Sequence, residues 1–327
     1  MANFIISGGF FDKYHGSILQ VTIRNNTIQV ISEHLIEHPE PSLAMRGKGL
    51  TGICQEDDHI WACFSNVIVK MDMVHFSIVD VIQDDNFNDL HGLAIHKGKL
   101  YVANTGYESI DIVNLENKVL NRIDLLGKDL RNRRPIWNQN EDTKPHLYHI
   151  SGIAIDESEN ILVCLVRQQR IINLSSWEWV GPKFKSPVHD LQYFNGDLWW
   201  TNVAGIVGKM DSKGETIEYS INGFQHDIGW TRGLSITNSG ILVGTAAARE
   251  SNHDYYKFST NSPTLQIGAK LCWISYDENL SSSAIELPNS ESRKIFSIHR
   301  LQDLRTDTIC RQSRFEEDFC QLTIDTA

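Results

Sequence analysis

Leu90-His91-Gly92-Leu93-Ala94-Ile95, followed after a polar turn by Lys99-Leu100-Tyr101-Val102-Ala103-Asn104-Thr105, is the stretch of sequence that indicates the fold. Both runs are short and largely apolar, and the first carries a small residue near its start. Short apolar runs bounded by turn residues are typical of β-strands. The segment therefore predicts two adjacent antiparallel strands.

The same pattern of two strands recurs along the chain. The four further copies pair residues 50–54 with 59–65, 150–155 with 161–165, 188–193 with 197–202, and 231–236 with 241–245. The small or polar residue near the start of each first strand recurs at intervals of 40, 60, 38 and 43 residues. Two more alternating segments follow each pair, such as 109–114 and 118–123. Four short strands per repeat of about 40 residues are the signature of propeller blades.

The two chain ends complete the count of blades. Residues 4–8, 17–23 and 27–31 read as the second, third and fourth strands of a blade, and residues 293–299 can supply its first strand. We therefore predict an all-β fold, a six-bladed β-propeller closed by pairing the N-terminal strands with a C-terminal strand, which removes exposed sheet edges. Residues 1–301 form this single domain, and residues 302–327 are expected to be a C-terminal tail packed on its outside.

Composition excludes several classes of protein. The 327-residue chain is 41% hydrophobic, which argues against disorder, and its net charge of −11 argues against a nucleic-acid-binding surface. The N-terminus lacks the pattern of a signal peptide, and no apolar run approaches the roughly 20 residues that span a membrane. Six cysteines are scattered without a CxxC pair. We expect a reduced cytoplasmic protein that binds neither nucleic acid nor membrane.

The propeller predicts where polar residues converge. In each blade the first strand begins, and the second strand ends, at the same end of the central channel, called here the mouth. The residues predicted to ring the mouth are Thr51, His91, Ser151, His189, Arg232 and either Arg293 or Lys294, with Asp89, His149, Pro187 and Trp230 two positions earlier, and Asn104, Asn202 and Thr245 from second strands. Two long insertions, 125–148 and 246–268, are expected at the same end, and long loops over a polar mouth are usually functional.

Three histidines of the mouth predict a metal site. His91, His149 and His189 come from consecutive blades, and neutral imidazole suits Zn, Fe or Cu. Three ligands with one open position are the arrangement of a catalytic metal. The alternative is that these histidines bond backbone groups or water and tie the blades together.

Arg232 predicts a second kind of contact at the mouth. Its planar guanidinium can bind a carboxylate or phosphate through two hydrogen bonds, so we assign it both a catalytic and a substrate-binding role. The alternative is pairing with a neighbouring Asp. The other residues that we expect to bind substrate are Asn104, Asn202, Trp230, Ser151 and Thr51. No phosphate-binding GxxxxGK(S/T) loop and no GxSxG motif occurs, and no nucleotide cofactor is expected.

The blade pattern resembles the superfamily of six-bladed propellers that includes the NHL-repeat and gluconolactonase-like proteins. In the lactonases the metal ligands come from the starts of the innermost strands, which is the position of His91 and His189, but they are carboxylates and Asn. The runs 89–94, 100–105, 146–152 and 186–189, with Arg232-Gly233-Leu234, are most similar to an uncharacterised bacterial family of conserved hypothetical propellers. That likeness spans about residues 45–300 and implies the fold and the place of the site.

Two functions follow as hypotheses. The first is an enzyme that acts on an anionic or carbohydrate-like small molecule, with His91, His149 and His189 holding a divalent transition metal and with His91, His189 and Arg232 as catalytic residues. The second is a non-catalytic propeller that binds a glycan, a peptide or a protein on the same face. A propeller hosts many functions, so the fold does not choose between them.

Overall fold

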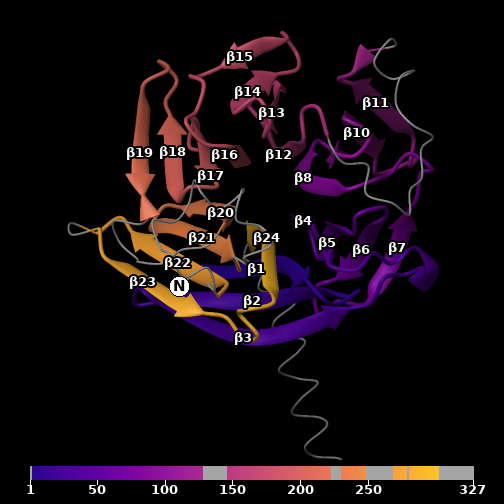
Figure 1. Cartoon of the computed structure of the whole chain (residues 1–327), viewed down its shortest axis with the longest axis horizontal. Coiled ribbons are helices and arrows are strands. Elements are labelled where there is room, and N and C mark those ends of the chain that lie inside the picture. Colours follow the sequence, from indigo (N-terminus) through magenta and orange to yellow (C-terminus); the bar gives the residue numbers. More distant parts are fainter. Residues whose placement is uncertain (1, 128–145, 222–229, 248–267, 278–279, 302–327) are drawn as a thin grey trace, which may run out of the picture.

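The computed structural model describes residues 2–127, 146–221, 230–247, 268–277 and 280–301. Within these residues the chain is all-β, apart from one short 3-10 helix, η1 (Pro41–Leu43). Six four-stranded antiparallel sheets stand around a central channel (Figure 1). The six-bladed β-propeller predicted from the repeats is therefore confirmed.

The blades follow one another along the sequence. Blade 1 consists of β4 (Gly52–Glu56), β5 (His59–Cys63), β6 (Ile68–Asp72) and β7 (Ile78–Ile82). Blade 2 consists of β8 (Leu90–His96), β9 (Lys99–Asn104), β10 (Ser109–Asn114) and β11 (Leu120–Asp124). Blade 3 consists of β12 (Ile150–Ile155), β13 (Ile161–Leu165), β14 (Arg170–Asn173) and β15 (Glu178–Val180). Blade 4 consists of β16 (Val188–Phe194), β17 (Asp197–Asn202), β18 (Ile206–Met210) and β19 (Thr216–Ser220). Blade 5 consists of β20 (Trp230–Thr237), β21 (Gly240–Ala246), β22 (Lys270–Ser275) and β23 (Ser282–Glu286).

Blade 6 closes the ring with both ends of the propeller. Its sheet order is β24-β1-β2-β3, with β24 (Arg293–Arg300), β1 (Ala2–Phe10), β2 (Gly16–Arg24) and β3 (Thr27–Ile36). Gly9 of β1 lies opposite Lys294 of β24. Arg293 is 1% exposed and donates to Glu33 Oε1 at 2.6 Å and to the Pro288 carbonyl at 2.8 Å. Arg293 is one of the two residues predicted for the mouth in this blade. Its buried side chain joins β24 to β3 of the closing sheet.

Aromatic side chains of the second strands fill the spaces between blades. Trp61 of β5 packs with Leu90 and Val102 of blade 2, and Tyr101 of β9 packs with Ile153 of blade 3. Both aromatic side chains are buried. Burial of large apolar side chains is the main favourable term in folding. This burial holds each blade against the next, as the alternating apolar residues of the second strands predict.

Glycines in the first strands let neighbouring blades approach at the mouth. A Cβ built on Gly52 would lie 2.0 Å from the His91 carbonyl oxygen, and one on Gly92 would lie 2.3 Å from that of Ser151. A Cβ on Gly152 would lie 2.7 Å from the His189 carbonyl oxygen. These are backbone atoms of the next blade, so no side-chain rotation relieves the overlap. The repeated glycine is thus a packing requirement.

Gly92→Ala is expected to destabilise the propeller by about 3 kcal/mol or more, since the backbone of blades 2 and 3 must separate. Gly98→Ala is the matched control, because no atom of the described residues lies within 4 Å of its Cβ position and its φ of +69° is the main penalty. The control should lose about 1 kcal/mol. Urea unfolding measures both. Equal losses of stability in Gly92→Ala and Gly98→Ala would show that the close backbone contact at Gly92 does not contribute to stability.

Candidate metal centre

The histidines predicted to share the mouth are brought together. The ring centroids of His91 and His149 lie 5.2 Å apart, and those of His91 and His189 lie 6.4 Å apart. A fourth imidazole, His146, lies 4.9 Å from His149. The sequence places His146 in the insertion 125–148, but the metal trio predicted from blade positions did not include it. The turn that carries both His146 and His149 brings it into the site.

Asp89, His146 and His149 form the cluster best suited to a metal ion. One ligand atom from each of the three lies within 4.8 Å of the other two. His146 Nδ1 is 2.8 Å from His149 Nδ1, and His146 Nε2 is 3.7 Å from Asp89 Oδ2. These two contacts use different nitrogens of the His146 ring, and one ion binds only one of them. A histidine ring must therefore rotate to bring three donors to the roughly 3.0–3.5 Å separation of donors that surround one ion at about 2.1 Å. Two imidazoles and one carboxylate suit a divalent transition metal.

The backbone at this cluster is held in an unfavourable conformation. Asp89 has a φ of +47° and His149 a φ of +53°, in the left-handed region that side chains disfavour. Both residues lie two positions before the residue that precedes the first-strand glycine, and blade 1 has Gly49 at that position with a φ of +65°. Glycine adopts this conformation without the steric penalty of a side chain. Retaining Asp and His at strained positions is typical of functional sites.

Glu108 positions the turn that carries both ligand histidines. This carboxylate, from the β9–β10 turn of blade 2, is fully buried and accepts the backbone N–H of Leu147 and of Tyr148. On the other side of the turn, Gln168 Nε2 donates to the Leu147 carbonyl at 3.0 Å. The turn is therefore fixed from two blades. A Glu in a polar turn gives no sequence signal for such a role, so no motif of the chain predicts it.

Glu108→Gln is expected to weaken metal binding by about 10–100-fold, the usual effect of losing a partner that orients metal ligands. The amide would turn an N–H group toward one of the two backbone N–H donors. Glu116→Gln, at an exposed position, is the control and should bind as wild type. Competition with a chromogenic zinc chelator measures both affinities. Unchanged affinity in Glu108→Gln would contradict the positioning role.

A buried polar network positions Asp89. Asn104 Nδ2 donates to the Asn86 carbonyl at 2.8 Å and to Asp111 Oδ2 at 2.9 Å, and Asn104 Oδ1 accepts the Asn88 N–H at 3.2 Å. Asp89 Oδ1 in turn accepts from Lys48 Nζ at 2.6 Å, while Oδ2 faces His146. Asn104 is itself fully buried. The structure therefore shows Asn104 supporting the segment that leads into Asp89, and its contact with a substrate stays a prediction.

His91 lies between the metal cluster and the central channel. Its Nδ1 donates to the Asp89 carbonyl at 2.8 Å, so Nε2 carries the lone pair. Burial, with a smaller effect of Arg232, lowers the pKa of His91 to about 3. Burial also lowers the pKa of His149 well below its ordinary value. Both rings are therefore neutral at pH 7, which is the form that binds metals.

His189 is engaged differently from the other histidines. Its Nε2 accepts a hydrogen bond from Arg232 Nε at 2.8 Å, and its Nδ1 lies 3.4 Å from Asp190 Oδ1. Asp190 also accepts from Thr201 Oγ1 and from the Gly233 N–H. In this arrangement His189 fixes the Arg232 guanidinium, which stacks 4.7 Å from the Phe296 ring. The predicted role of His189 as a metal ligand stays a prediction.

The remaining predicted residues have varied surroundings. Thr51 Oγ1 donates to the Leu90 carbonyl and Ser151 Oγ donates to the His189 carbonyl at 2.6 Å, so both hydroxyls link blades. Asn202 Oδ1 accepts the Ala204 N–H at 3.0 Å within its own turn. Trp230 begins β20 and is half-buried. Most of the two insertions, and the whole of the 302–327 tail, lie outside the described residues.

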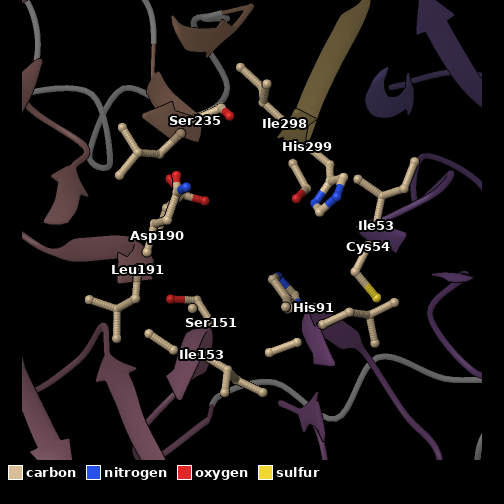
Figure 2. Close-up of a pocket in the computed structure, with 18 of the residues that line it drawn as sticks. Ile53, Cys54, His91, Ser151, Ile153, Asp190, Leu191, Ser235, Ile298 and His299 are labelled. Carbon is tan, nitrogen blue, oxygen red and sulfur yellow. The ribbon is translucent and has the colours of Figure 1, made fainter. Parts of the chain in front are cut away.

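A cavity of about 750 Å³ occupies the central channel. It is lined by the first strands of all six blades, and His189 is among its lining residues. His91 and Asp190 also line it (Figure 2). Its volume falls in the range of small-molecule sites. The metal cluster and this cavity therefore meet at His91.

Comparison with known proteins supports the fold. No protein-family model and no curated protein matches the chain. A structure of a nidogen/laminin complex matches with 9% identity and a TM-score of 0.63, covering 93% of this chain and 100% of that chain. A protein of unknown function from Bacteroides caccae matches with 11% identity and a TM-score of 0.54, covering 92% and 99%. A streptogramin B lyase matches with 14% identity and a TM-score of 0.52, covering 88% and 89%.

These likenesses are of fold, and the kinship with NHL and gluconolactonase-like propellers stays a prediction. The described residues contain no helix long and apolar enough to cross a membrane. The four cysteines among them, Cys54, Cys63, Cys164 and Cys272, are buried free thiols. The cytoplasmic location stays a prediction.

Proposed function

We propose that the protein is a metal-dependent enzyme that acts on a small molecule at the mouth of the propeller. The observation that carries the proposal is the convergence of Asp89, His146 and His149, two of them held at positive φ. Blade 1 has Gly49 at the equivalent position with positive φ, so Asp89 and His149 stand where glycine would be less strained. The ion would be zinc, iron or copper, each of which binds imidazole and carboxylate.

The bound ion would act as a Lewis acid or lower the pKa of a water molecule. Asp89 would bind it through Oδ2, since Oδ1 accepts from Lys48. His91 would offer the lone pair of Nε2 as a hydrogen-bond acceptor, because its Nδ1–H is bonded to the Asp89 carbonyl. Glu108 holds the two ligand histidines in place through the backbone.

The substrate would be anionic or carbohydrate-like. Arg232 is fixed at its Nε by His189 and can orient a carboxylate or phosphate, and Lys48 places a second cation beside Asp89. Among the matched structures, one is named a lyase and another is a complex of two proteins. Because a propeller supports both kinds of function, the proposal rests on the side chains of the mouth.

Metal analysis of protein purified without a histidine tag tests this function. We expect close to one zinc, iron or copper ion per chain by mass spectrometry, and we expect the apoprotein to regain it on addition of the ion. Hydrolysis or elimination on a panel of lactones, carboxylic esters and phosphate esters should disappear on chelation and return with the metal. A chain that takes up no transition metal under these conditions is not this enzyme.

A further inference from the structure

We infer that the central channel is a second ligand site, which adjoins the metal centre at His91 and binds an uncharged molecule rich in hydroxyl groups, such as a small sugar or polyol. The inference goes beyond the proposed function and does not require a bound metal.

The middle of the channel is polar. The first strand of each blade is the innermost in its sheet order, so one edge of its backbone faces the axis without a strand partner. Such an edge presents N–H and C=O groups that need hydrogen bonds. Figure 2 shows that Ile53, Ile153 and Leu191 turn away from the middle and toward the spaces between blades. The aliphatic residues of the lining therefore leave the interior to polar groups.

His299 is the lining residue whose surroundings give the strongest evidence for a bound ligand. Its imidazole and that of His91 lie inside the ring of the other labelled side chains (Figure 2). The Nε2 atom of His299 is enclosed and has no hydrogen-bond partner among the described residues. Because an enclosed lone pair is tolerated better than an enclosed N–H, the proton belongs on Nδ1, which can then donate to a bound molecule. Ser235 and Ser297 add hydroxyl groups to the same lining.

The charges of the lining favour a neutral ligand. Burial lowers the pKa of His299 to about 4, so this ring is uncharged at pH 7. Asp190 is the carboxylate of the lining, and its charge is compensated by Thr201 Oγ1, the Gly233 N–H and nearby Arg232. Arg300, the other charged lining residue, is exposed at the last position of β24. An ion in the middle of the channel would lose its hydration without gaining a counter-charge, which is strongly unfavourable.

The volume agrees with this ligand class. A cavity of about 750 Å³ accommodates a mono- or disaccharide together with bridging water. Hydroxyl groups both donate and accept, which matches a lining of serines, a neutral imidazole and backbone edges.

Ligand-observed NMR and calorimetry with three size-matched probes test the inference: D-glucose, D-glucuronate and D-glucosamine, with maltose as a longer neutral probe. We expect the neutral sugars to bind with dissociation constants of about 0.1–10 mM, and the charged analogues to bind at least about tenfold more weakly. His299→Leu should weaken glucose binding about tenfold or more. His299→Gln keeps a donor and an acceptor and should bind closer to wild type.

His96→Leu is the matched control, since its Nε2 is also enclosed with no hydrogen-bond partner in the described part of the chain, but His96 is not among the residues that line the cavity. It should bind glucose as wild type does. The measurements are repeated on chelator-treated protein, so that a missing metal site and a missing channel site give different results. The inference is overturned if no neutral sugar binds, if the charged analogues bind equally well, or if His299→Leu behaves like wild type or no worse than His96→Leu.

Discussion

His149→Asn is expected to lower the affinity for Zn²⁺ by roughly 100-fold or more, because outer partners of a ligand alone contribute 10–100-fold. The substitution removes an imidazole from the Asp89, His146 and His149 cluster. Asn is chosen because it tolerates the left-handed backbone that His149 adopts, with a φ of +53°. The loss of zinc affinity then measures the removal of the imidazole ligand rather than a change in backbone strain.

His75→Asn is the control for this substitution, since His75 is exposed in the β6–β7 turn of blade 1 and is not part of the cluster. Its zinc affinity should equal that of wild type. Competition with a chromogenic chelator gives both constants, and circular dichroism checks that each variant is folded. Equal zinc affinity in His149→Asn and wild type would remove His149 from the metal site.

Arg122→Met is expected to destabilise the protein by about 3–5 kcal/mol, the usual effect of removing one partner of a buried ion pair. Arg122 donates to Asp111 at 2.6 Å and 2.8 Å and to Asp84 at 3.0 Å. Asp111 is fully buried and also accepts from Ser109 at 2.8 Å. Without the guanidinium, the Asp111 carboxylate would remain buried without a cationic partner.

Lys118→Met provides the matched control, because its ion pair with Asp80 is largely exposed and should contribute only about 0–1 kcal/mol. The double variant Asp111→Asn with Arg122→Met should recover part of the lost stability, since it leaves no charge buried at position 111 and its amide oxygen can still accept a hydrogen bond from Asn104 or Ser109. Urea unfolding of the four proteins gives the values. A loss below about 1 kcal/mol in Arg122→Met would show that the pair is not a stabilising feature of blade 2.

The fold could be predicted from the sequence because each blade repeats the same local pattern. A small residue in the first strand and apolar alternation in the second are both required by blade packing, as the contact of Gly92 with Ser151 shows. Closure of the ring of blades could be predicted because the three N-terminal strands form a blade that lacks its first strand. Blade register also placed His91, His149 and His189 near one another.

The details of the site could not be predicted in this way. The position of a residue in its blade predicts whether its side chain lies near the mouth. It does not predict which of these side chains already bond to neighbouring residues. His189 faces Arg232, while His146, which belongs to an insertion, completes the cluster with Asp89 and His149. Glu108 acts through the backbone of another blade, and such a contact leaves no motif. The sequence repeat arises from the packing of the blades. The site depends on the turn that carries His146 and His149, and this turn belongs to a segment that interrupts the repeat.

Anomalous X-ray diffraction at the zinc absorption edge, from crystals of tag-free protein grown with ZnCl₂, tests the central claim most directly. We predict one strong peak bonded to Asp89 Oδ2 and to a ring nitrogen of His146 and of His149, at about 2.0–2.2 Å from each. Peaks confined to exposed histidines, or an Asp89, His146 and His149 cluster without a peak at saturating zinc, would contradict it.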